Sequence, residues 1–590
     1  MRLINVKAFL EREQLMSQRK GVNRRTKVLE FCHEDEATKY AILSHRWIDS
    51  TEVSYDEMVD LAKMNVEGRD EIRHRLGYKK VLDTCRQASN NGYEWVWVDT
   101  CCIDKRSSAE LSEAINSMYR WYANSGVCYA HLHDVHGSSF PTEQDKKEYP
   151  KSDGWPEWFS RGWTLQEMIA SSNVQFFNSD WKSIGDKKAL ARTLTCITQV
   201  PEHILKEGLL GNRPCVAQIM SWAAKRTTTR VEDKAYSLMG LLDVNMPMLY
   251  GEGKKAFHRL QLEIIHTSND QSIFAWGHDT DNVRTGSVLA DDPSFFWGCS
   301  QMEPLDDAEL IDFLKLTSFP GVEQVELPSI DQDFFGTFPV TNRGIHTWML
   351  LRPYRDSDSV FQAYLPCLNS LGRPVTIDLV LWNSNYYRYS TLIGSTSENF
   401  PQLRQVYLRY QDMACNITFE IDDSAITENG FTCSDNYPPR PTGNTLALTA
   451  ADPLCIRTYS ERQGNSRFAV AFGQCIGQDW IHLINDPPYD LSWSSMGVLM
   501  VKAPNYSKSM ADVPSRNNYR SRVWVHHTRI PGSTWIVRAR RVVWDRSRIG
   551  VQIKVFQNSW FRDGLDEWKT LDIEASDFLV VQMDIYYDRT

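Results

Sequence analysis

Short apolar runs and amphipathic stretches alternate along the first half of the chain. A short apolar run that ends in polar groups is typical of a buried strand, and apolar residues spaced three and four apart are typical of a helix. The runs that predict strands are 40–47 (YAILSHRW), 93–104 (YEWVWVDTCCID), 127–135 (VCYAHLHDV) and 173–178 (NVQFFN). The stretches that predict helices between them are 77–92, 108–126 and 158–171. This alternation predicts an α/β fold, with a parallel sheet that carries helices on both faces.

The pattern changes in the second half of the chain. Residues 181–275 are predicted to be mainly helical, with amphipathic stretches at 230–244 and 252–268. After them, short β-like runs alternate with turn residues, which predicts an all-β sandwich or barrel. Clear examples of these runs are 361–366, 375–382, 405–410, 534–544, 550–556 and 578–587.

These patterns divide the chain into two predicted domains. The first covers residues 1–275 and consists of an α/β core over 1–180 and a helical extension over 181–275. The second is a β-rich domain over 276–590, for which we expect a regulatory or sensory role. A chain of 590 residues is long enough for more than one hydrophobic core.

Composition narrows the classes of protein to which the chain can belong. The net charge of -10 argues against a general nucleic-acid binder. The N-terminal residues contain no apolar segment of the signal-peptide type, and no run reaches the ~18 apolar residues of a membrane span. The 13 cysteines include no C-x-x-C pair. We therefore expect free thiols, a cytoplasmic location and no membrane span.

Polar residues follow the predicted strands at the edge of the sheet where ligands of α/β proteins bind. Ser44, His45 and Arg46 end the first run, and Asp99 lies near the end of the second. Two other chemistries are open at the same edge. Metal binding would use the histidines of HLHDVH, which are His131, His133 and His136, although a site needs further ligands. A cysteine hydrolase would use Cys101 or Cys102 with His45, although buried inert thiols are far commoner.

The stretch WFSRGWTLQE (158–167) contains the most specific candidate for catalysis. In a helix over 158–171, Trp163 and Glu167 lie on one face because they are four residues apart. Leu165 and Ile169 lie on another face, from which they can pack on the sheet. We expect the Trp163–Glu167 face to point to the rim of the sheet. There a carboxylate beside an aromatic wall can stabilise an oxocarbenium-like sugar, although an ordinary solvated glutamate fits the same spacing.

Several of these blocks, taken in order, resemble the heterokaryon-incompatibility (HET) domain of fungi. They are YAILSHRW, WVWVDTCCIDK, WFSRGWTLQEMIA, the stretch SAELSEAINSMYRWYANSGVCYAHLHDV and the stretch from RVEDKAYSLMGLLDV to FHRLQLEII. The resemblance covers residues 1–275. It implies a role in programmed cell death when incompatible fungal cells fuse, or in fungal innate immunity, together with a partner protein that triggers the response.

The HET domain is in turn remotely similar to Toll/interleukin-receptor (TIR) domains, which implies a flavodoxin-like sheet. In enzymatic TIR domains the glutamate of a W-x-x-x-E pattern cleaves NAD, and the matching residue here is Glu167. The resemblance also implies that Ser44, His45, Arg46 and Asp99 line the nucleotide site. Trp47 or Trp163 would stack on a ring, and Arg46 or Arg161 would neutralise the pyrophosphate.

The TIR similarity further implies that NAD is a substrate and that neither a metal nor another cofactor is needed. It implies that activity requires self-association into an oligomer or filament. The product would be ADP-ribose or its cyclic form. An alternative of another class is a non-catalytic HET scaffold that recruits a separate death effector, because many TIR domains are scaffolds only.

Overall fold

The computed structural model describes most of the first 317 residues and a series of segments beyond them. The described residues are 1–19, 27–32, 39–209, 211, 213–277, 286–317, 338–354, 359–382, 384–389, 396, 400–411, 417–437, 445–448, 454–462, 466–475, 478–485, 525–529, 535–543 and 549–557. The chain divides into two compact units. The first consists of residues 1–282, 289–340 and 365–376, and the second of 283–288, 341–364 and 377–590.

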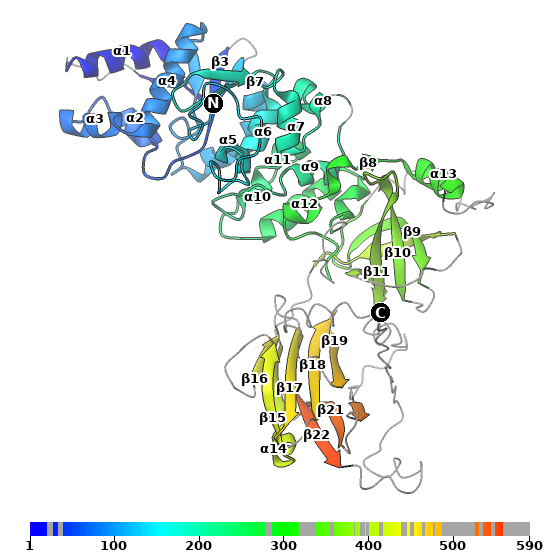
Figure 1. Cartoon of the computed structure of the whole chain (residues 1–590). Coiled ribbons are helices and arrows are strands. Elements are labelled where there is room, and N and C mark those ends of the chain that lie inside the picture. The colour runs from blue at the N-terminus through cyan, green and yellow to red at the C-terminus, as the bar shows by residue number, and fades with distance from the viewer. Residues whose placement is uncertain are drawn as a thin grey trace. The chain divides into compact units, whose positions relative to one another are not determined.

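A seven-stranded sheet forms the centre of the first unit (Figure 1). Its order is β2-β1-β4-β3-β5-β6-β7. The strands are β1 (Arg2–Asn5), β2 (Leu29–Phe31), β3 (Tyr40–His45), β4 (Trp95–Trp97), β5 (Val127–His131), β6 (Val174–Phe177) and β7 (Ser183–Asp186). The four predicted strands are β3 to β6, and they pair in parallel as expected. Beyond these four strands the sheet is extended at both edges by strands that were not predicted, β1, β2 and β7, which pair antiparallel.

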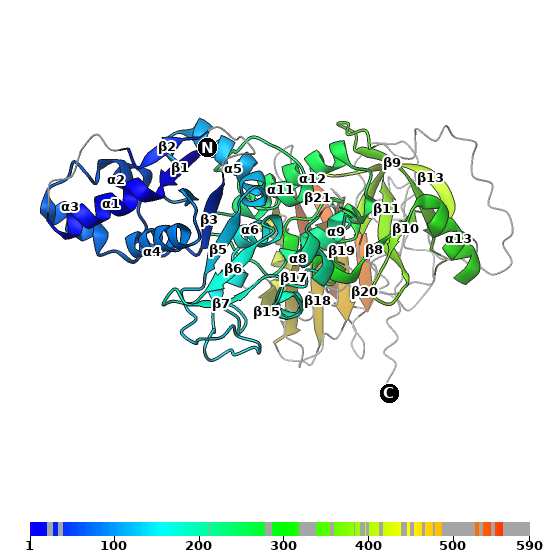
Figure 2. The same ribbon diagram turned by 90° about the horizontal axis from the view of Figure 1, so that it is seen from above.

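Helices cover both faces of this sheet (Figure 2). The helices of the α/β core are α1 (Val6–Ser17), α2 (Tyr55–Asp60), α3 (Val66–Arg73), α4 (Leu76–Asn90), α5 (Ser108–Ala123), the 3-10 turn η1 (Glu157–Ser160) and α6 (Trp163–Ala170). Helix α4 contacts β4 and α1, and α6 contacts β3 and α5. Because side chains alternate along a strand, neighbouring residues of β3 point to opposite helical layers.

Several predicted boundaries are wrong, and the third strand, predicted over 127–135, ends at His131. The second strand was expected over 93–104, but β4 ends at Trp97 and the chain then turns. The helix expected over 158–171 is broken into η1 and α6 at Arg161 and Gly162. At the break the backbone N–H of Gly162 donates to the carbonyl of Thr227 at 3.0 Å, so it is not available to a continuous helix. A Cβ at position 162 would lie 2.6 Å from Cγ2 of Thr228.

The rest of the first unit is mainly helical, as predicted. Its elements include α7 (Ala191–Thr198), α8 (Glu202–Glu207), α9 (Val216–Trp222), α10 (Asp233–Tyr236), α11 (Met239–Leu242), α12 (Lys255–Thr267), η2 (Gln271–Phe274), η3 (Pro293–Phe296), η4 (Cys299–Gln301), β8 (Glu303–Pro304) and α13 (Asp307–Thr317). The single helix predicted over 230–244 is instead the two short helices α10 and α11. Helix α13 lies within the region for which only strands were predicted.

The β-rich character predicted for the C-terminal half is confirmed. Strands β9 (Ile345–Pro353), β10 (Val360–Leu368), β11 (Pro374–Trp382), β12 (Asn385–Tyr389) and β13 (Gln402–Leu408) pair in the order β11-β12-β13-β9-β10. An additional pairing between β10 and β11 closes these five strands into a barrel.

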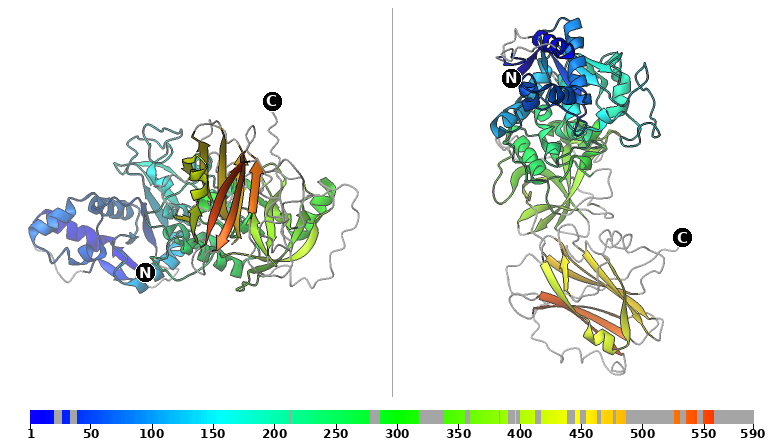
Figure 3. Two further views of the ribbon diagram at one scale, coloured as in Figure 1. Left: turned by 90° about the horizontal axis from the view of Figure 1, so that it is seen from below. Right: turned by 90° about the vertical axis from the view of Figure 1, so that its left-hand side faces the viewer.

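Two further sheets follow the barrel in the chain and form adjacent layers (Figure 3). One sheet has the order β16-β14-β22-β21-β20 and the other β15-β17-β18-β19. Their elements are β14 (Ile417–Asp422), α14 (Ser424–Glu428), β15 (Phe431–Tyr437), β16 (Thr445–Leu448), β17 (Leu454–Glu461), β18 (Arg467–Cys475), β19 (Gln478–Asn485), β20 (Val525–Arg529), β21 (Trp535–Val543) and β22 (Ile549–Gln557). The run predicted at 578–587 lies outside the described residues.

Candidate functional site

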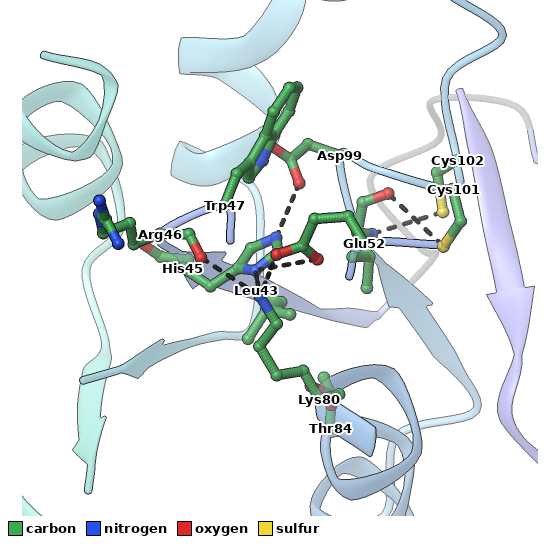
Figure 4. A network of polar contacts seen from close by, with 12 residues as sticks. Leu43, His45, Arg46, Trp47, Glu52, Lys80, Thr84, Asp99, Cys101 and Cys102 are labelled. Carbon is green, nitrogen blue, oxygen red and sulfur yellow. Dashed lines mark hydrogen bonds and ion pairs between the residues drawn. The ribbon is translucent and has the colours of Figure 1, made fainter. Parts of the chain in front are cut away.

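The carboxyl ends of β3 and β4 bring four of the predicted site residues together (Figure 4). The carboxylate of Asp99, two residues beyond β4, accepts from two groups near the end of β3. Its Oδ1 lies 3.0 Å from Nε2 of His45, and its Oδ2 accepts from Nε1 of Trp47 at 2.7 Å. Asp99 therefore holds the strand end and the start of the following loop in one arrangement, in which Arg46 lies between the two held residues.

Lys80 of α4 completes this network from beneath the sheet. Its ammonium lies 2.9 Å from Nδ1 of His45, donates to the carbonyl of Arg46 at 3.2 Å and pairs with Glu52. An ammonium has three protons and no acceptor, so these three contacts use all of its donors. Nδ1 of His45 must then be the acceptor, which leaves Nε2 to carry the proton that is donated to Asp99. Contacts with Lys80 and Asp99 thus hold the ring of His45 in one orientation.

Burial and charge act in opposite directions on the ionisable groups of this network. Burial lowers the pKa of Lys80, while the carboxylate of Glu52 opposes that effect. Burial would raise the pKa of Asp99, but the hydrogen bonds from His45 and Trp47 and the charge of Lys105 hold it below its ordinary value. Asp99 therefore remains an anion at neutral pH and a strong acceptor for the two side chains that it holds.

The accessible rim of the site consists of aromatic and charged side chains. Trp47 is 45% exposed, and the ammonium of Lys105 lies 3.7 Å from the centre of its ring. Nε of Arg46 forms an ion pair of 2.8 Å with Oε2 of Glu157, and His133 lies 3.7 Å from the same oxygen. An exposed tryptophan beside cations can stack on a flat ring and attract phosphate.

Glu167 belongs to α6 and lies on the side of β3 opposite His45. Ser44 points away from His45, and its hydroxyl contacts the carboxyl of Glu167. The same hydroxyl oxygen accepts from the indole Nε1 of Trp158 at 2.8 Å. Because Trp158 can only donate, the proton of Ser44 is free to point at Glu167. The result is a buried chain of donors that ends at the carboxyl group.

The ionisation of Glu167 is strongly perturbed. Burial raises the pKa of its carboxyl to about 8, and the negative charge of Asp99 adds to that effect. Hydrogen bonds from Ser44 and Tyr122 and the positive charge of Arg226 act in the opposite direction. A carboxyl with a pKa about one unit above neutrality is mostly protonated at pH 7, with roughly a tenth of it ionised. Such a group can serve as an acid or, once ionised, as a buried anion.

Trp163 and Glu167 both lie in α6, four residues apart, but the expectation that their face is open at the rim of the sheet is wrong. Glu167 is only 6% exposed, because α6 is covered by the sheet on one side and by α5, α8 and α11 on others. Trp163 is half-buried and hydrogen-bonds to Asp233. Arg161 lies in the turn before α6, where Nη2 donates to the hydroxyl of Thr229 at 3.0 Å. The structure therefore separates Trp163 from the His45 network and leaves Trp47 as its exposed ring.

The cysteine alternative does not fit the geometry. Cys101 and Cys102 are buried in the turn after β4. Contact with Cys102 and burial raise the pKa of Cys101 well above its ordinary value. A nucleophilic thiol needs the opposite shift, towards the thiolate. The imidazole of His45 is also fully used by Asp99 and Lys80.

The three histidines of HLHDVH have different partners and do not converge on one site. The ring of His131 stacks on Trp181 with centres 4.9 Å apart. Nδ1 of His136 lies 2.9 Å from the hydroxyl of Ser179, while His133 faces Glu157. Within the part of the chain that the structure describes, no group of three His, Cys, Asp or Glu side chains could hold a metal ion.

Several residues of the site were not identified from the sequence. Lys80 lies on the buried stripe of α4 with Gly77, Thr84 and Ala88. A lysine at an apolar position of an amphipathic helix is a signal that could have identified it. Tyr122 and Arg226 gave no such signal, because their contacts with the Glu167 region depend on the tertiary packing of α5 and of the segment after α9.

The N-terminal part of the chain is similar to known proteins. Residues 40–156 match the model of the heterokaryon incompatibility protein (HET) family, and residues 255–292 match a domain of unknown function, DUF8212. Vegetative incompatibility protein HET-E-1 of Podospora anserina is 42% identical over 277 residues, which is 45% of this chain. The chain spans only 19% of the length of that relative. No solved structure gives a significant match.

The matched family segment includes Ser44, His45, Arg46, Trp47 and Asp99, and it ends before α6. A TIR-like fold remains a prediction, because the comparisons give it no solved counterpart. Among the described residues no helix is long and apolar enough to cross a membrane. The family match over residues 40–156 and the 42% identity with an incompatibility protein support one conclusion, which is that the N-terminal part of this chain contains a HET domain.

Proposed function

We propose that the HET domain of this protein hydrolyses NAD through Glu167 once the protein has assembled, and that the loss of NAD drives an incompatibility or cell-death response. The observation that carries the proposal is the carboxyl group of Glu167, buried beside the carboxyl end of a parallel strand, bonded to Ser44 and with a pKa raised to about 8. Strongly perturbed carboxyls beside the ligand edge of a sheet are functional-site candidates. The incompatibility role is supported by the similarity to a vegetative incompatibility protein.

The chemistry requires little more than a placed anion. Water attacks the anomeric carbon of the nicotinamide riboside, the carbon–nitrogen bond breaks, and its electron pair neutralises the pyridinium as nicotinamide leaves. The products are nicotinamide, ADP-ribose and one proton. The leaving group needs no general acid because it is already cationic. The ionised form of Glu167 would stabilise the positive charge that develops on the ribose.

The remaining predicted residues would bind the rest of the substrate. Trp47 offers an exposed ring for stacking, and Arg46 offers a guanidinium at the same rim. Arg161 contacts Thr229 in the turn before α6 and would act only after that turn has moved. Because Glu167 is 6% exposed, the ribose reaches it only after a rearrangement of the neighbouring loops. Self-association would supply that rearrangement, which makes the activity dependent on assembly.

A second candidate function is a non-catalytic scaffold that recruits a separate effector. The burial of Glu167 and its bond to Ser44 favour this function, since a satisfied buried carboxyl can be purely structural. The two functions differ in one variant. Glu167→Gln keeps the shape and an acceptor for Ser44, so a scaffold would keep its death-inducing activity in cells, and an NAD hydrolase would lose it.

The biochemical test is the release of nicotinamide from NAD by the purified full-length protein over a range of protein concentrations. The proposal expects a rate per molecule that rises with concentration and that disappears in Glu167→Gln. Assembly is measured in parallel by light scattering. Assembled wild-type protein that releases no nicotinamide would reject the enzymatic function and leave the scaffold.

A further inference from the structure

Helix α6, which carries Glu167, is short and has no side-chain caps of its own. It has eight residues, and neither Gly162 at its N-terminus nor Ser171 at its C-terminus provides a capping side chain. A buried helix terminus needs hydrogen-bond partners from elsewhere, because its end groups have none within the helix. Two buried cations that follow α6 in the sequence provide those partners.

Lys187 holds the C-terminal end of the helix. Its side chain lies just beyond β7 and is 1% exposed. The ammonium donates to the carbonyl of Met168 at 3.0 Å and also to the carbonyl of Ser171. A cation at this end also complements the negative end of the helix dipole. Lys187 therefore satisfies carbonyl groups at the end of α6 and fixes where the helix stops.

Arg226 holds the other end. Nη1 donates to the carbonyl of Arg161 at 2.8 Å and to the hydroxyl of Thr164 at 3.0 Å, and Nε donates to the carbonyl of Trp222 at 3.3 Å. The residue is 7% exposed, and its Nη2 atom is buried without a hydrogen-bond partner. Burying a guanidinium with an unsatisfied donor lowers the stability of the fold unless a nearby negative charge compensates for it.

Thr164, which accepts from Arg226, lies near Glu167 on helix α6. Thr164 and Glu167 are three residues apart and lie on the same face of α6. Helical side chains lean towards the N-terminus, so the carboxyl of Glu167 leans towards the turn that Arg226 holds. Burial lowers the pKa of Arg226, and the negative charge of Glu167 opposes that effect. The cation thus both fixes the helix start and lies within electrostatic reach of the candidate catalytic carboxyl.

We propose that Arg226 is a positioning residue for Glu167, which sets the start of α6 and stabilises the ionised form of the carboxyl. The catalytic consequence rests on the proposed function, but the effect on ionisation does not. The other groups that face Glu167 are Ser44 on β3, Asp99 beyond β4, Tyr122 on α5 and Cys128 on β5. Among these charges, Arg226 is the cation that opposes the effects of burial and of Asp99.

The test measures the ionisation of Glu167 without any turnover. For each parent protein, the stability to urea is compared with that of the same protein carrying Glu167→Gln, from pH 5 to pH 10. This difference in unfolding free energy changes with pH in the range where Glu167 is ionised in the unfolded chain but protonated in the folded chain. It levels off above the pKa of Glu167 in the folded protein. The parents are wild type, Arg226→Gln, Arg226→Lys and Lys187→Met.

Arg226→Gln removes the charge and keeps a donor for Thr164, and Arg226→Lys keeps the charge. We expect the levelling-off in Arg226→Gln to move upwards by about one pH unit or more, as for the loss of a nearby opposite charge. Arg226→Lys and Lys187→Met should level off where wild type does. The proposal would be overturned if the levelling-off pH of Arg226→Gln equalled that of wild type, or if Lys187→Met shifted it by the same amount. If Arg226→Gln does not fold, a shift of the levelling-off in Arg226→Lys would overturn it instead.

The two proposals fail in different ways. If the protein releases no nicotinamide but Arg226→Gln shifts the ionisation of Glu167, the positioning of the carboxyl stands and NAD hydrolysis falls. If nicotinamide is released and no shift occurs, hydrolysis stands and the role of Arg226 falls. In an active protein, Arg226→Gln should also move the rising limb of the rate profile to higher pH by the same amount.

Discussion

Replacing Glu167 with glutamine should stabilise the protein more as the pH rises. The folded pKa is raised to about 8 from an ordinary value of 4.5. An acid whose folded pKa is raised contributes its stability fully below the unfolded pKa and loses it as pH rises towards the folded pKa. Each pH unit between these values costs ~1.4 kcal/mol. Between pH 5 and pH 7, wild type should therefore lose about 2 to 3 kcal/mol relative to Glu167→Gln.

The assay is urea unfolding of the full-length wild type and variant at intervals of one pH unit, followed by a probe in the first unit such as protection of the β3 and α6 amides. Glu113→Gln serves as the control, because Glu113 is an exposed glutamate on α5. The control difference should stay flat across the same range. A flat difference for Glu167→Gln as well would refute the burial of an uncharged carboxyl at this position, and with it the reasoning about its chemistry.

Three further variants test the two sides of β3. Ser44→Ala leaves the indole of Trp158 without its acceptor and should lower the free energy of unfolding by about 1 to 3 kcal/mol, measured by urea unfolding. Lys80→Met removes the cation between His45 and Glu52 and should cost about 3 kcal/mol, with faster proteolysis of the loop after β3. Trp47→Ala, at an exposed position, should change stability by less than about 1 kcal/mol and should raise the KM for NAD, in the account given above. An unchanged KM for NAD in a folded Trp47→Ala protein would contradict a binding role.

The sequence was sufficient to predict the order of elements in the α/β core. Apolar runs such as Tyr40–His45 fix a buried strand, and the polar groups that follow them mark the edge at which Asp99 meets His45 and Trp47. Those contacts depend on the parallel order of β3 and β4, which short connections between alternating strands and helices favour.

The sequence could not predict the surroundings of α6. Spacing placed Glu167 opposite Leu165 and Ile169, but all three are buried because the helix is enclosed on several sides. The helices that enclose it come from elsewhere in the chain, as does Arg226, and periodicity within one helix carries no information about them. The short length of β4 was missed for a related reason, since the apolar residues Cys101 to Ile103 are buried in a turn and resemble a continued strand.

The pH dependence of nicotinamide release is the decisive measurement for a catalytic Glu167, because it joins the chemistry to the structure of one carboxyl group. Assembled wild-type protein should release nicotinamide from NAD at a rate that rises about tenfold per pH unit below pH 8 and then levels off, as Glu167 ionises. Glu167→Gln, assembled to the same extent, should release none. A rate that does not vary with pH and persists in Glu167→Gln would contradict the assignment of Glu167 as the catalytic carboxyl.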